Sequence, residues 1–191
     1  MRKFLIVFIL ACLSYSGYTQ ESANIPALDI GSKLTYKVDF RGMKYDFIID
    51  LKQLEPKIIY DWRMTIADDK KGTVTMQPEA IATANKQYNY FDKAEINLTD
   101  ATCVWVSKAV FASLKDGKPT VMNSGRADKT FLKKDQPAGS QPAAGGRQID
   151  CIYAESEDGT EKYWIMNNPE FPLILKMDLG WQIAIDAITN L

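Results

Sequence analysis

The sequence contains no histidine among its 191 residues. Without an imidazole there can be no Ser-His-Asp or Cys-His catalytic arrangement, no histidine-ligated zinc and no haem held by a histidine. The phosphate-binding glycine patterns GxGxxG and GxxxxGKS/T are also absent. We therefore expect no cofactor, no metal site and no enzymatic activity.

Cysteine is scarce, with three residues in the whole chain: Cys12, Cys103 and Cys151. The first lies in the N-terminal apolar segment, which leaves two for the rest of the chain. In an exported protein, Cys103 and Cys151 are candidates for one disulfide, closing a loop of about 50 residues. The alternative is two separate buried thiols that behave as small apolar side chains.

Long apolar runs are absent after the N-terminus. Arg2 and Lys3 precede the apolar run 4–13, and small and polar residues follow it. This order is typical of a secretory signal peptide, and the run is too short to span a bilayer. We predict a signal peptide at 1–19, a single β-rich domain at 20–191, and a periplasmic or extracellular location.

A competing interpretation treats "ILAC" as a lipobox with Cys12 lipidated, which would make the protein a membrane-anchored lipoprotein. On this reading the membrane is a partner only through the lipid on Cys12. The folded domain would be the same in either case.

A basic surface is also lacking. Removing residues 1–19 takes away Arg2 and Lys3 and no acidic residue, so 23 basic residues fall to 21 against 24 acidic ones, a net charge of about −3. No dense cluster of Lys or Arg occurs elsewhere, so we expect no nucleic-acid partner.

Paired carboxylates remain as a catalytic device. The candidate sets are Asp68/Asp69, Asp46/Asp50 and the cluster Glu155, Glu157 and Asp158. The aspartates at 68, 69 and 158 stand in turn sequences, and Asp46 and Asp50 fall on the polar face of a strand. We therefore interpret all three sets as structural or solvated.

The regular pattern in the sequence is an alternation of apolar and polar residues. It runs through "KLTYKVDF", "YDFIIDL" and the segment 58–66, which are separated by the short polar turns "RGM" and "EPK". It returns after residue 148 in several short segments. Alternation between polar turns predicts consecutive half-buried antiparallel strands.

Two stretches break this alternation. "QPEAIATANKQ" predicts a short helix with Pro78 in its first turn. "VSKAVFASLKDG" predicts another, with Ser107 as the N-cap and Gly117 just past its end. The segment 133–146 is rich in Pro, Gly, Ala and Ser and predicts a long surface loop.

The predicted fold is mainly β: a single antiparallel curved sheet, or an open or half β-barrel, of about nine to ten strands with one or two short helices. The chain has nine Tyr, eight Phe and four Trp, and many of them fall on the apolar face of successive strands. A packed core explains them. A concave face lined by Tyr36, Phe47, Trp62 and Trp164 that holds an apolar ligand explains them as well.

Three segments carry a resemblance: "LDIGSKLTYKVDF", "WVSKAVFASLKDGK" and "GGRQIDCIYAE" with the following "EKYWIMNNPEFPLILKMDLG". Together they resemble a group of uncharacterised exported β-rich proteins of Gram-negative bacteria. Those proteins carry a strand with glycine and cysteine, a Trp on the following strand and a Pro-Leu segment before the final hairpin. The resemblance implies a fold related to the open half-barrel lipoprotein carriers of the periplasm, and it implies no activity.

The function that these observations favour is a non-enzymatic exported module of the cell envelope that binds an apolar small molecule or a partner protein. One alternative is a structural or accessory envelope protein that acts by protein–protein contact along a free sheet edge. A further alternative is a carboxylate-based glycoside hydrolase, which requires two carboxylates facing each other across a groove.

Overall fold

The computed structural model describes residues 24–189 of the chain. The predicted signal peptide and Cys12 lie outside these residues, so those two predictions are not tested by the structure. Within residues 24–189, no helix is both long enough and apolar enough to span a membrane.

The described chain forms fifteen strands and two short helices. In chain order they are β1 (Lys33–Phe40), β2 (Met43–Gln53), β3 (Ile58–Met64), β4 (Lys71–Met76), α1 (Pro78–Thr83), β5 (Lys86–Gln87), β6 (Glu95–Leu98), β7 (Ala101–Thr102), α2 (Lys108–Lys115), β8 (Thr120–Asn123), β9 (Asp128–Lys134), β10 (Ala143–Ala144), β11 (Arg147–Gln148), β12 (Cys151–Ser156), β13 (Lys162–Met166), β14 (Ile174–Asp178) and β15 (Gln182–Thr189).

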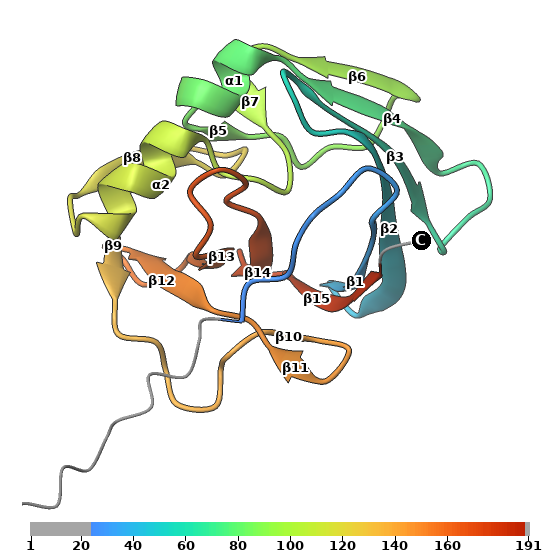
Figure 1. The fold of residues 1–191 in the computed structure, drawn as a ribbon. Coiled ribbons are helices and arrows are strands. Elements are labelled where there is room, and N and C mark those ends of the chain that lie inside the picture. The colour runs from blue at the N-terminus through green and yellow to red at the C-terminus, as the bar shows by residue number, and fades with distance from the viewer. Residues whose placement is uncertain (1–23, 190–191) are drawn as a thin grey trace, which may run out of the picture.

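Thirteen of the strands form one curved, nearly closed sheet in the order β6-β4-β3-β2-β1-β15-β14-β13-β12-β9-β8-β5-β7, while β10 and β11 form a separate hairpin. Figure 1 shows the strands following one another around a ring. The predicted barrel-like β class is confirmed. The predicted count of nine to ten strands is too low, because strands of only two to four residues are too short to show an alternation of apolar and polar residues in the sequence.

The alternation in β1 and β2 explains their place in the wall. Leu34, Tyr36 and Val38 are at most 4% exposed, and the residues between them face outward. Tyr36 stands directly opposite Phe47 on β2. Such cross-strand pairs stabilise a sheet, and burying each large apolar side chain contributes about 1.5–3 kcal/mol.

The sheet is closed in two different ways. β1 and β15, the first and last strands, pair antiparallel through seven residues of each. On the opposite side of the ring, the edge strands β6 and β7 are consecutive in the chain and are separated only by residues 99–100. The covalent chain therefore bridges the seam that no β6–β7 ladder closes.

The sheet is not wholly antiparallel as expected, because β4–β6, β5–β7 and β5–β8 are parallel pairs. The first of these depends on a glycine. A Cβ atom at Gly72 would lie 2.0 Å from the backbone oxygen of Ala94, and this oxygen accepts a hydrogen bond from the amide of Thr73. Glycine is therefore required for the chain before β6 to approach β4.

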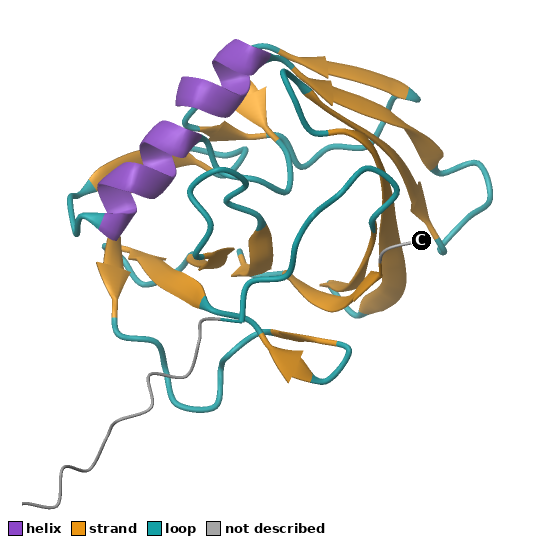
Figure 2. Ribbon diagram, in the orientation of Figure 1, coloured by secondary structure: helices purple, strands orange, loops and turns teal. Residues whose placement is uncertain are grey.

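The two helices lie side by side at one end of the ring, as Figure 2 shows. Both predicted helices are present: α1 carries Pro78 in its first turn, and α2 has Ser107 as its N-cap, with the hydroxyl accepting a hydrogen bond from the amide of Val110. α2 buries Val110, Phe111 and Leu114 against the core. The predicted loop 133–146 contains the end of β9 and the short strand β10.

Candidate ligand-binding pocket

A cavity of about 580 Å³ opens at the end of the ring where the turns β1–β2, β3–β4, β8–β9 and β14–β15 meet. We name it the mouth pocket. Its walls are mainly apolar, and they include Tyr45 and Phe47 of β2, Met177 of β14 and Ile183 of β15. The volume lies within the range of about 300–1,000 Å³ found for small-molecule sites.

Aromatic rings form the floor of the mouth pocket. Phe47 and Phe91 both line it, and their ring centroids are 4.7 Å apart. Phe91 also lies 4.8 Å from Trp62, and Phe47 lies 6.4 Å from Tyr36. These spacings are those of favourable aromatic pairs, so the floor is a continuous extension of the core.

Three of the four predicted binding residues therefore belong together. Phe47 lines the pocket, whereas Tyr36 and Trp62 lie behind it and support it. The Tyr36 hydroxyl donates a hydrogen bond of 2.9 Å to the carbonyl of Ile174. Burial raises the pKa of Tyr36 well above its usual value, so this hydroxyl remains a donor.

The structure does not bring Trp164 to this group. Its neighbours on β13, Tyr163 and Ile165, belong to the core inside the ring, so Trp164 points to the outer face. There its ring packs at a tilt against Tyr153 with a centroid separation of 4.9 Å, and its Nε1 donates to the Ser140 hydroxyl. β13 is buried on both faces, and alternation alone cannot distinguish them.

Of the two alternatives for the cysteines, the structure has the separate thiols, because Cys103 and Cys151 are both free. Cys103 is buried at the inner end of the mouth pocket, and its amide donates to the sulfur of Met76. Cys151 begins β12, and its thiol donates to Gln136 Oε1. Burial raises the pKa of each thiol to about 12.

Three basic side chains line the outer part of the mouth pocket: Arg41, Lys70 and Arg126. We call them the rim cations. They come from three different turns, those between β1 and β2, β3 and β4, and β8 and β9. Asp92 is the one carboxylate among the lining residues, and it accepts a hydrogen bond from the hydroxyl of Tyr88.

Backbone strain is also concentrated at this pocket. Among residues 24–189, Arg41 and Val104 are the two residues other than glycine with positive φ, at 54° and 64°. Both line the mouth pocket. This conformation is unusual for a β-branched residue such as Val104, whose carbonyl is held by the amide of Ile174. Strained residues of this kind cluster at functional sites.

A buried polar group adjoins the pocket. The hydroxyl of Ser124, which lines the wall, donates to the carboxylate of Glu161, and Lys129 Nζ lies 3.1 Å from the other oxygen of that carboxylate. Glu161 is only 4% exposed, so its charge needs this pairing. Glu161 carries no distinguishing signal in the sequence, because it stands among several acidic residues of the β12–β13 turn.

Four of the seven carboxylates that the sequence placed in sets, Asp46, Asp50, Glu155 and Asp158, have side-chain partners. Asp46 and Asp50 bind lysines on the outer face of the sheet. Asp158 accepts hydrogen bonds from Ser156, Thr160 and Lys129, and these bonds hold its pKa well below the usual value. Within residues 24–189, no cluster of three Cys, Asp or Glu residues is arranged to hold a metal ion.

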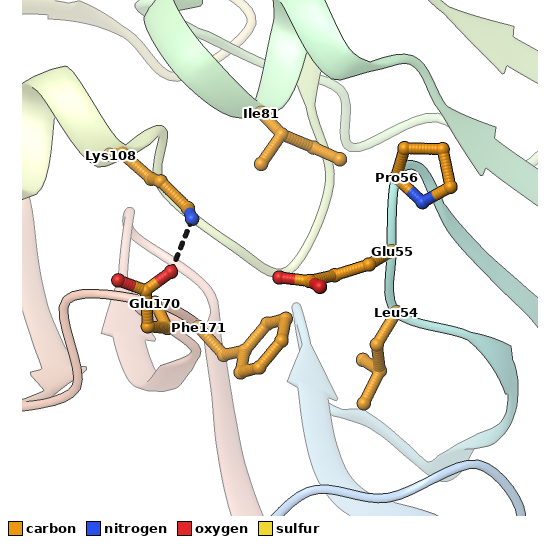
Figure 3. Close-up of a pocket in the computed structure, with 7 residues that line it drawn as sticks. All are labelled: Leu54, Glu55, Pro56, Ile81, Lys108, Glu170 and Phe171. Carbon is orange, nitrogen blue, oxygen red and sulfur yellow. Dashed lines mark hydrogen bonds and ion pairs between the residues drawn. The ribbon is translucent and has the colours of Figure 1, made fainter.

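A second cavity, of about 490 Å³, lies at the opposite end of the ring, where the β2–β3 turn meets α1 and the start of α2. Figure 3 shows its charged residues. Lys108 is neutralised by Glu170 at 2.6 Å, and the Glu55 side chain points into the pocket. Few residues line this second cavity, and its one cation, Lys108, is already paired. The mouth pocket is therefore the better candidate for a ligand.

Comparison with known proteins finds no match: no family model, no curated protein sequence and no solved structure is significantly similar to this chain. The geometry of the pocket itself is therefore the guide to function.

Proposed function

We propose that this protein is a non-enzymatic binding module that holds one apolar small molecule in the mouth pocket. The observation that carries the proposal is a cavity of about 580 Å³ with aliphatic and aromatic walls at an open end of a barrel-like sheet. Barrels of this general kind hold single small ligands in the same position. The proposed setting is the cell envelope, on the strength of the predicted signal peptide.

The other two functions have less support in the structure. Protein contact along a free sheet edge requires an edge long enough to pair, but β6 has four residues and β7 has two. A glycoside hydrolase requires two facing carboxylates, whereas among the described residues Asp92 is the one carboxylate that lines the mouth pocket. In the second cavity, which Glu55 and Glu170 line, Glu170 is already paired with Lys108.

A pair of matched variants tests the proposal. Ile66 and Val121 are both 46% exposed, but only Ile66 lines the mouth pocket. We expect the wild type to bind Nile red, a neutral apolar dye, with a rise in its fluorescence. Ile66→Glu should weaken binding at least about tenfold, because it places a charge in an apolar wall. Val121→Glu should bind as the wild type does.

Equal binding by all three proteins would place the dye elsewhere and overturn the proposal, as would an absence of binding by the folded wild type. Native mass spectrometry of the protein taken gently from the envelope of its host then identifies the natural ligand. A non-covalent adduct that disappears on denaturation gives the mass of that ligand.

A further inference from the structure

Positive charge is in excess among the side chains that line the mouth pocket. Three cations and one carboxylate line it, in a chain whose formal net charge is −1. Among residues 24–189, none of the rim cations forms an ion pair, and Asp92 is engaged with Tyr88. Positive charge is therefore available at this opening.

On β1 and β2, the strands joined by the turn that contains Arg41, every lysine has an acidic partner. All four lysines of β1 and β2 have carboxylate partners: Lys33 with Asp50 at 3.8 Å, Lys37 with Asp46 at 2.9 Å, Lys44 with Asp39 at 3.9 Å and Lys52 with Asp61 at 3.3 Å. Arg41 lies in the turn that joins the same two strands and, within the described chain, has no such partner.

The backbone at Arg41 strengthens this argument. Residues 41 and 42 form a two-residue hairpin turn in which both φ angles are positive, 54° and 87°. Such turns favour Asn, Asp or Gly at the first position. Arginine is unfavourable there, yet its guanidinium carbon lies 5.4 Å from the centre of the Phe40 ring, at the edge of the pocket. The unfavourable backbone conformation of Arg41 therefore places a cation at the edge of the pocket.

Three polar groups of the pocket lining already have hydrogen-bond partners within the protein. Ser124 donates to Glu161, the Asn89 amide donates to the Ser124 carbonyl at 3.0 Å, and the Tyr90 hydroxyl donates to the Gly125 carbonyl at 3.2 Å. These donors are therefore directed to protein acceptors. The interior suits a hydrocarbon group, and the rim suits a negative one.

Building on the proposed function, we infer that the ligand is a single-chain amphiphile with an anionic head. Its hydrocarbon chain lies against Phe47 and Phe91, and its carboxylate or phosphate receives charge-assisted hydrogen bonds from Arg41, Lys70 and Arg126. The volume of about 580 Å³ is that of a site for one small molecule, which favours one chain over several.

The test uses four probes with the same chain, each below its micelle concentration or solubility limit: dodecanoate, dodecyl phosphate, dodecan-1-ol and dodecylamine. Binding is measured directly by calorimetry and by displacement of Nile red. We expect one of the two anions to bind at least about tenfold more tightly than the alcohol, and the amine to bind more weakly than either anion. The better anion identifies the head group.

Two triple variants assign the effect to the rim cations. Arg41→Gln with Lys70→Gln and Arg126→Gln should lose most of the preference for anions, so that the anions bind about as tightly as the alcohol. The matched control removes three cations outside the pocket, Lys57→Gln, Lys133→Gln and Arg147→Gln, and should keep the preference. Thermal unfolding followed by circular dichroism checks that both variants are folded.

The outcomes separate the two proposals. If the wild type binds Nile red and takes the alcohol as tightly as the anions, the apolar pocket stands and the anionic ligand is wrong. If both triple variants lose the preference equally, the effect is one of net charge and the rim assignment is wrong. If the folded wild type binds neither the dye nor any probe, both proposals fail.

Discussion

At the scale of single residues, the mouth pocket is marked by conformational cost. Arg41 and Val104 adopt backbone angles that L-residues with side chains disfavour, and both contribute to its lining. A left-handed conformation costs a residue other than glycine roughly 1–2 kcal/mol. Natural proteins accept such costs where a particular side chain is needed, so stability and binding should be separable at these positions.

Arg41→Asn is the residue-scale test of this separation. Asn tolerates the left-handed conformation of this turn, so we expect the variant to be more stable than Arg41→Gln by about 0.5–1 kcal/mol in denaturant unfolding. The comparison between Asn and Gln cancels the loss of the cation–π contact with Phe40, which both variants share. Both should bind the preferred anionic probe more weakly. Equal stabilities would contradict the argument from strain.

The two cysteines give a second prediction at this scale. With pKa values of about 12, Cys103 and Cys151 are almost entirely protonated at pH 8, and the thiol is not the nucleophile. We expect the folded protein without residues 1–19 to resist iodoacetamide at pH 8. In urea without reductant, both thiols should be alkylated, as intact-mass measurement would show. Labelling that requires a reductant would reveal a disulfide and contradict the structure.

At the scale of elements, the pairing of β4 with β6 depends on a position without a side chain. Gly72→Ala would place a methyl group 2.0 Å from the Ala94 carbonyl oxygen, which is backbone and cannot rotate away. We expect a loss of about 1–3 kcal/mol in the free energy of unfolding, with faster hydrogen exchange in β6. Lys71→Ala, at the exposed neighbouring position, is the control and should have little effect.

The β12–β13 hairpin gives a pH-dependent prediction. Hydrogen bonds from Ser156, Lys129 and Thr160 lower the pKa of Asp158 in the folded state. A lowered folded pKa stabilises the protein above the unfolded value of 3.8, and this stabilisation is lost as the pH falls through the folded value. Asp158→Asn should therefore lower the melting temperature at neutral pH, and its difference from the wild type should shrink below pH 3.8.

Glu157→Gln is the matched control for this hairpin. Glu157 is the exposed neighbour of Asp158, and it forms no ion pair with any residue of the described chain. Its removal alters the net charge equally but should leave the melting temperature nearly unchanged at each pH. An Asp158→Asn deficit that stayed constant into strong acid would show that the lost contact is not electrostatic.

At the scale of the whole molecule, the sequence predicts those strands of the ring that have one face exposed to solvent and one face buried in the core. Alternation identifies β1, β2 and β3, and the capping signals at Pro78 and Ser107 identify both helices. The segment containing β5, β6 and β7 carries no such signal. Its strands are two to four residues long and are held by parallel partners, so tertiary contacts decide their structure.

The pocket is predictable only in part for a related reason. Tyr36, Phe47 and Trp62 lie on successive strands, so alternation brings them to one face. The side of the sheet on which Trp164 lies cannot be predicted in this way, because β13 is buried on both faces. The rim cations stand in turns, at 41, 70 and 126, where no periodicity applies. Their convergence follows from the order of strands around the ring, which no local pattern encodes.

Because β1 pairs with β15, the ring can close only after both strands have been synthesised. Residues 33–40 leave the ribosome well before their partner on one side, residues 182–189. Until then β1 can pair only with β2, and the ring is missing the join between its two halves. Contacts so distant in sequence form slowly, and unpaired edges attract other chains. Until β15 is in place, we expect one edge of β1 to stay open to pairing with other chains.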